Sequence, residues 1–118
     1  MTESMHLRPQ DLLAHLPLPA TTKWPHGVFD IEAFARGGMT LRLFAPRGVD
    51  HQSPHSQDEL SIVVTGNAVL DIDSVEHDCA TGDALFVPAR VPHRFVRISD
   101  EFAAWVVFWG ESVGQGAD

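Results

Sequence analysis

Hydrophobic and polar residues alternate in short runs along most of the chain, and glycine, proline and aspartate separate the runs. A period of two residues is typical of β-strands, and turn residues between such runs are typical of hairpins. We therefore predict an all-β fold, a sandwich or barrel of short antiparallel strands. The predicted strands lie near Val28–Arg36, Met39–Ala45, Glu59–Thr65, Ala68–Ile72, Val75–His77, Ala84–Pro88, His93–Ile98 and Phe102–Trp109.

One segment near the N-terminus has helical periodicity instead. In Arg8–Leu16, Pro9 suits a first helical position, and three leucines recur at helical spacing before Pro17 ends the segment. We divide the chain into an N-terminal extension with a short helix (1–22), a β-domain (23–110) and a tail (111–118). The tail is small, polar and rich in glycine, so we expect it to be disordered.

Two predicted strands are apolar on both faces. In Glu59–Thr65 and Phe102–Trp109, hydrophobic side chains occur at both odd and even positions. A strand of an antiparallel sheet normally exposes one face to water. Either a second sheet or a subunit interface must cover the other face, and we predict a homodimer.

Composition narrows the classes of partner. The 118 residues suffice for one domain, and the formal net charge is −8, from 8 basic and 16 acidic residues. This charge opposes binding to nucleic acid or to an anionic membrane surface. No apolar run approaches the roughly 20 residues of a membrane helix, and no secretory signal pattern is present. We expect a cytoplasmic protein whose ligand is a small molecule.

The single cysteine limits the chemistry further. Cys79 cannot form an intrachain disulfide or a CxxC zinc site, so any metal must have nitrogen and oxygen ligands. Cys79 itself is expected to be a buried apolar side chain rather than a nucleophile.

Candidate ligands gather in GVDHQSPHSQDELSIVVTG, Gly48 to Gly66. If this segment is extended, His51 and His55 project from one face, and Glu59 joins them from the next strand. Far downstream, His93 opens another β-rich segment after two prolines. The other histidines have no partners at ligand spacing and are expected in surface or capping roles: His6, His15, His26 and His77.

The pattern resembles that of small single-domain cupins of the RmlC-like superfamily, whose motifs read G-x5-H-x-H-x(3,4)-E-x6-G and G-x5-P-x-G-x2-H-x3-N. The matching positions are His55, Glu59, Gly66, Gly82, Pro88 and His93. The resemblance runs from about Met39 to Trp109. It implies that residues 23–110 form a double-stranded β-helix, the cupin barrel.

The resemblance also implies a mononuclear metal held by His55, Glu59 and His93. Two imidazoles and a carboxylate suit a divalent transition metal, and they do not choose among Fe, Mn, Ni, Co and Zn. Ser53 stands where the family has its first histidine, so His51 or the amide oxygen of Gln57 is a candidate for a further ligand.

The second motif departs from the family at two arginines. Arg90 replaces the motif glycine and Arg97 replaces the final asparagine, so we expect an altered turn. By strand parity Arg97 shares a face with His93, where its fork could bind a carboxylate or phosphate, as could that of Arg42. The alternative for these arginines is an exposed position paired with an acid.

Cupins resembling this chain include dioxygenases, isomerases, decarboxylases and noncatalytic binding modules, so fold analogy does not choose a reaction. We expect a metal-dependent oxygenase or isomerase acting on a small anionic molecule. The alternatives are a noncatalytic module that binds or senses a small ligand, and a structural barrel without metal.

Overall fold

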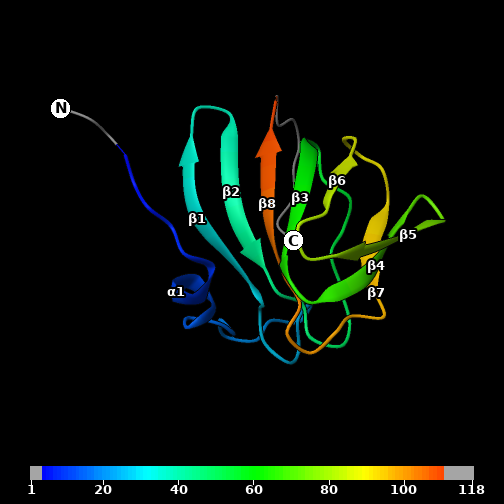
Figure 1. Cartoon of the computed structure of the whole chain (residues 1–118), viewed down its shortest axis with the longest axis horizontal. Coiled ribbons are helices and arrows are strands. Elements are labelled where there is room, and N and C mark those ends of the chain that lie inside the picture. Colours follow the sequence, from blue (N-terminus) through cyan, green and yellow to red (C-terminus); the bar gives the residue numbers. More distant parts are fainter. Residues whose placement is uncertain (1–3, 111–118) are drawn as a thin grey trace.

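The computed structural model describes residues 4–110, which form two antiparallel β-sheets and one short helix (Figure 1). The larger sheet has the strand order β1-β2-β8-β3-β6 and the smaller one β5-β4-β7. The strands are β1 (Asp30–Arg36), β2 (Met39–Phe44), β3 (Asp58–Thr65), β4 (Asn67–Ile72), β5 (Val75–Ala80), β6 (Ala84–Val87), β7 (His93–Val96) and β8 (Ala103–Trp109). The all-β prediction is confirmed, and every predicted strand is present. The expected disordered tail, 111–118, lies outside the described residues.

The core lies between the two sheets. Leu70 and Phe95 from the smaller sheet pack in one cluster with Phe44, Val63 and other buried residues of the larger sheet. Cys79 belongs to this cluster, as its apolar character predicted, and its thiol donates a weak hydrogen bond to the Ala68 carbonyl at 3.4 Å. Burial raises the pKa of this thiol, which suits a packing role.

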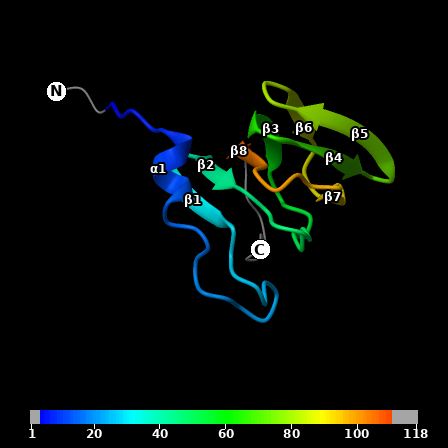
Figure 2. The same cartoon turned by 60° about the horizontal axis from the view of Figure 1, so that its bottom comes forward.

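Helix α1 (Pro9–Leu13) covers part of the outer face of the larger sheet, beside β1 and β2 (Figure 2). Its leucines pack on the buried cluster of Leu43, Ala45 and Ala103, as does Trp105 of β8. The α-helix ends three residues before the predicted Leu16, because backbone N–H groups of the following turn bond three rather than four residues back. No helix in the described range 4–110 is long and apolar enough to cross a membrane.

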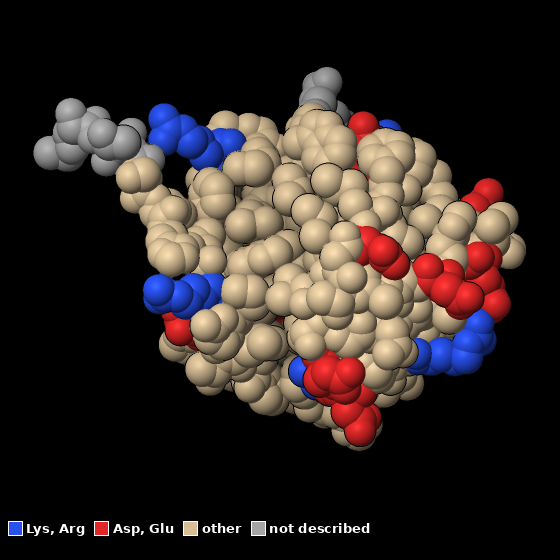
Figure 3. All heavy atoms as spheres, in the orientation of Figure 1, with Lys and Arg blue, Asp and Glu red and all other residues tan. Residues whose placement is uncertain are grey.

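The rest of that outer face carries an apolar row running across all five strands. Cross-strand pairing aligns the row, whose members are Phe34, Leu41, Val107, Leu60 and Phe86. In the orientation of Figure 1, the centre of the surface is mostly uncharged, and acidic side chains lie at the right, over the smaller sheet, and at the lower edge (Figure 3). At one end of the row Phe86 is 52% exposed and lies near Trp109, which is 37% exposed.

Candidate metal centre

Three buried side chains from separate parts of the barrel meet at one point. His55 lies in the loop before β3, Glu59 is the second residue of β3, and His93 opens β7. One ligand atom from each can be chosen so that all lie within 4.8 Å of one another. His93 Nε2 is 2.8 Å from Glu59 Oε1, and His55 Nε2 is 3.7 Å from the same oxygen.

The closest pair of the cluster lacks a proper hydrogen bond. Among the described residues, Glu59 Oε1 and His93 Nε2 are buried without a hydrogen-bond partner, because their 2.8 Å contact does not have hydrogen-bond geometry. His93 Nδ1 lies 2.9 Å from the Val91 carbonyl oxygen, so Nδ1–H donates there and the neutral imidazole keeps a lone pair on Nε2. A cation between two buried acceptors would satisfy both, so these residues fit a divalent metal.

Electrostatics favour a positive charge in the cluster. Burial lowers the pKa of His93, but the Glu59 carboxylate, the Val91 carbonyl and Asp50 together outweigh it, so the pKa is raised. Protons therefore compete for Nε2 at a higher pH than they would at an ordinary histidine. A metal at this position would be displaced as the pH falls through the raised pKa.

The loop that carries His55 is organised by a residue that sequence reasoning missed, Asp50. Its carboxylate accepts backbone N–H bonds from Gln52 at 2.9 Å and from Phe95 at 2.8 Å, and one from the Gln52 side-chain amide. Burial raises the pKa of Asp50, although these N–H donors and the nearby His93 oppose the shift. An aspartate bonding the backbone two residues ahead is a recognisable turn signal, but its bond to Phe95 has no local signal.

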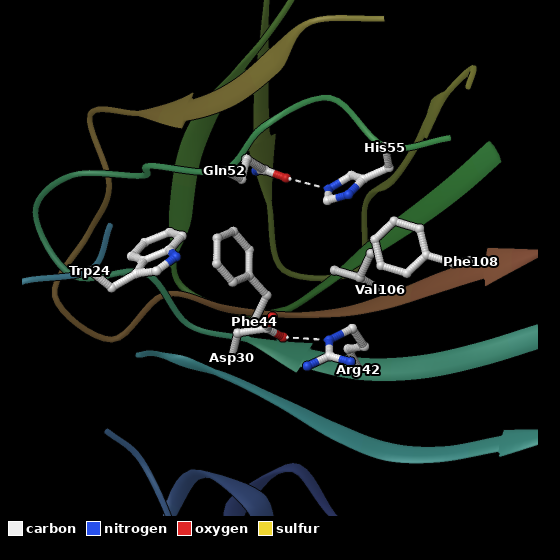
Figure 4. A pocket seen from close by; sticks show the side chains of 8 residues that line it. All are labelled: Trp24, Asp30, Arg42, Phe44, Gln52, His55, Val106 and Phe108. Atoms are coloured by element: carbon white, nitrogen blue, oxygen red, sulfur yellow. Dashed lines mark hydrogen bonds and ion pairs between the residues drawn. The ribbon is translucent and has the colours of Figure 1, made fainter. Parts of the chain in front are cut away.

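Gln52 is the second residue that was missed. Its side-chain amide lies in the same cluster, with Oε1 3.2 Å from His55 Nε2 (Figure 4). Nothing in the family motif marks this position, which is next to the expected one at Ser53.

The two arginines of the second motif flank β7, with Arg90 before it and Arg97 directly after it. Arg90 (φ 68°) and Arg97 (φ 48°) both adopt the left-handed conformation that glycine and asparagine favour. The Arg90 N–H donates to the His55 carbonyl at 2.6 Å. This bond joins the second motif directly to the loop of the first.

The two residues predicted as further ligands, His51 and Gln57, make other contacts. His51 is exposed, and its ring packs edge-on against Trp24 with centroids 5.2 Å apart. The Gln57 amide donates to the carbonyls of Gly38 and Gly110, both at 3.0 Å. Because residues 50–57 are not a strand, the parity that grouped His51 with His55 does not apply.

Of the two arginines proposed to bind an anion, Arg97 lies on the surface and Arg42 lies at the pocket. The Arg97 side chain is 62% exposed and pairs with Glu76 at 2.8 Å, because its left-handed backbone breaks the alternation that began at His93. Arg42 instead lines the pocket next to the cluster. Its Nε donates to Asp30 at 2.9 Å, and its Nη1 lies 3.6 Å from Glu32.

The pocket is small: about 20 Å³ is open to the centre of a water molecule, and the roughly 300 Å³ not filled by protein atoms includes open solvent. Figure 4 shows its lining, with the imidazole of His55 on one side and Arg42 on the other. The full lining is Trp24, Asp30, Arg42, Phe44, Gln52, His55, Val106 and Phe108. A mostly apolar lining with a few polar groups is typical of a small-molecule site.

Several known proteins are similar to this chain in sequence or in fold. An uncharacterized protein of Streptomyces coelicolor is 41% identical over 72 residues, 59% of this chain and 69% of that protein. A cupin 2 conserved barrel domain protein from Salinispora arenicola has 23% identity and a TM-score of 0.67, with 92% of this chain and 91% of that one covered. The DMSP lyase DddQ from Ruegeria pomeroyi has 18% identity and a TM-score of 0.60, with 70% and 46% covered. The cupin domain family matches residues 40–109, so the chain belongs to the cupin domain family.

Proposed function

We propose that this cupin binds one divalent transition metal through His55, Glu59 and His93. The observation that supports it best is the buried pair of unsatisfied acceptors, Glu59 Oε1 and His93 Nε2. Neither atom has a hydrogen-bond partner among the described residues, and a bound cation would accept a lone pair from both. Two imidazole nitrogens and one carboxylate oxygen leave coordination positions open for an exogenous ligand.

For the reaction we propose a metal-dependent oxygenase or isomerase acting on a small anionic molecule. The metal, when bound, would supply a Lewis acid or a site for O₂. Trp24, Phe44 and Phe108 would exclude water and contact the apolar part of the substrate. Arg42 would bind its anionic group, with Asp30 holding the guanidinium in place from one side.

A noncatalytic binding module is the second candidate. The pocket wall supports it, because its one carboxylate, Asp30, is already paired with Arg42 and is poorly suited to act as a general base. A module of this kind would be stabilised by a ligand that is recovered unchanged. An enzyme would consume the same ligand in the presence of metal.

Elemental analysis of protein purified without an affinity tag or chelator tests the metal site. We expect close to one metal per wild-type chain, and His55→Ala should lose at least about 10-fold in affinity and shed the metal on dialysis. His77→Ala is the matched control, since His77 is exposed on β5. Equal metal in the wild type and His55→Ala, or none in the wild type after anaerobic reconstitution, would refute the proposal.

We also propose that a second copy of the chain covers the apolar row of the larger sheet. Light scattering should give twice the monomer mass, and Phe86→Asp should weaken the dimer by at least about 10-fold, because the new charge would be buried in the interface. Val75→Asp is the control, since Val75 is 57% exposed but lies on the smaller sheet. A monomeric wild type, or equal effects of the two variants, would contradict this assembly.

A further inference from the structure

Resting on the proposed metal site, we propose that the side-chain oxygen of Gln52 is a fourth ligand of the metal. The family motif would have an imidazole at the next residue, Ser53. In this chain Ser53 is exposed, and its hydroxyl accepts a hydrogen bond from the Lys23 ammonium at 2.8 Å. Ser53 thus faces away from the cluster, and Gln52 takes the place beside His55.

Gln52 Oε1 and His55 Nε2 are separated by the distance expected of two neighbouring ligands of one ion. Metal–ligand bonds of about 2.0–2.2 Å at angles between octahedral and tetrahedral place neighbouring ligand atoms about 3–3.5 Å apart. Gln52 Oε1 is 3.2 Å from His55 Nε2, between the 2.8 Å and 3.7 Å separations of the Glu59 oxygen from the two histidines.

The amide is oriented so that its oxygen, and not its nitrogen, faces the cluster. Gln52 Nε2 donates to the buried carboxylate of Asp50, which leaves Oε1 directed at the His55 ring (Figure 4). Asp50 is in turn held by the backbone N–H groups of Gln52 and Phe95. A residue that orients a ligand through its second polar atom is a regular feature of metal sites.

The competing interpretation is that Oε1 accepts a hydrogen bond from His55 Nε2–H. In that arrangement His55 Nε2 carries a proton and cannot bind a metal through that atom. With the metal bound, the lone pairs of His55 Nε2 and Gln52 Oε1 would both face the ion. The two interpretations therefore differ in the spectrum of the bound metal, and not only in its affinity.

Titration with Co²⁺ distinguishes the two interpretations. Its visible absorption reports the ligands of the ion, and competition with a chromophoric chelator gives the affinity. Gln52→Ala should lower Co²⁺ affinity by at least about 10-fold and change the absorption bands, because a donor is removed from the ion. Gln52→Glu restores an oxygen at this position and should bind Co²⁺ at least 10-fold more tightly than Gln52→Ala. Ser53→Ala, on the same loop, should match the wild type in both measurements.

Wild-type affinity in Gln52→Ala would overturn the proposal, as would weaker binding with an unchanged spectrum, which would mean that Gln52 acts only through His55. Thermal unfolding of the metal-free variants shows whether each is folded. Loss of Co²⁺ binding in His55→Ala together with wild-type behaviour of Gln52→Ala would retain the metal site and reject the fourth ligand. Absence of Co²⁺ binding by the wild type would reject both.

Discussion

Glu59→Gln is expected to lose more than about 100-fold in metal affinity while the metal-free protein becomes no less stable. The carboxylate would be the only anionic ligand of the proposed site, so its removal should exceed the 10- to 100-fold effect typical of an outer-shell change. In the metal-free protein, the new amide can donate to the lone pair of His93 Nε2, an atom now left without a hydrogen bond. Satisfying that buried pair is worth about 1 kcal/mol.

The two effects are measured separately, by chelator competition for the metal and by urea unfolding in excess chelator. Glu76→Gln is the matched control, because that carboxylate is half-exposed and pairs with Arg97 on the surface. It should leave metal affinity unchanged. Wild-type metal affinity in Glu59→Gln would remove Glu59 from the site, and a marked loss of metal-free stability would assign it a structural role instead.

The strands and three candidate ligands could be predicted from the sequence, because they depend on local residue patterns or on the fixed spacing of a motif. Alternation and turn residues mark each strand, and the motif spacing marks His55, Glu59 and His93. Glu59 and His93 lie on strands, and strand geometry fixes the face on which a side chain projects. Residues with these properties can be placed before the structure is known.

The loop before β3 could not be predicted in this way. Its shape depends on hydrogen bonds to distant backbone, from Phe95 N–H to Asp50 and from Arg90 N–H to the His55 carbonyl. No pattern within the loop specifies those partners. Parity therefore grouped His51 with His55, whereas the folded loop brings Gln52 to His55 and turns His51 toward Trp24.

Arg97 shows the same limit at the other end of β7. Alternation continued from His93 would place its side chain inside the barrel. The left-handed conformation at Arg97 ends the strand pattern and directs the side chain to Glu76 on the surface. A single residue with positive φ is enough to reverse the predicted face.

The largest effect on folding is expected at Gly66, the last residue of the first motif, which connects β3 to β4. Its φ is +80°, and a Cβ there would lie 2.5 Å from Ser99 Oγ and 2.9 Å from Phe102 Cα. Phe102 is fully buried, so its backbone cannot retreat without disturbing the core. Gly66→Ala should therefore destabilise the protein by about 3 kcal/mol or more, through left-handed strain of about 1–2 kcal/mol together with the clash.

Gly82→Ala separates the backbone strain from the steric clash. Gly82 also has a positive φ, +93°, but a Cβ there meets nothing within 4 Å. Its loss of unfolding free energy in urea should be limited to the strain, about 1–2 kcal/mol. Equal losses in the two variants would mean that Phe102 and Ser99 move aside easily. A larger loss in Gly66→Ala would mean that the β3–β4 turn is packed tightly against the Phe102 backbone. That packing fixes the start of β4, and β4 pairs with β7, which carries His93.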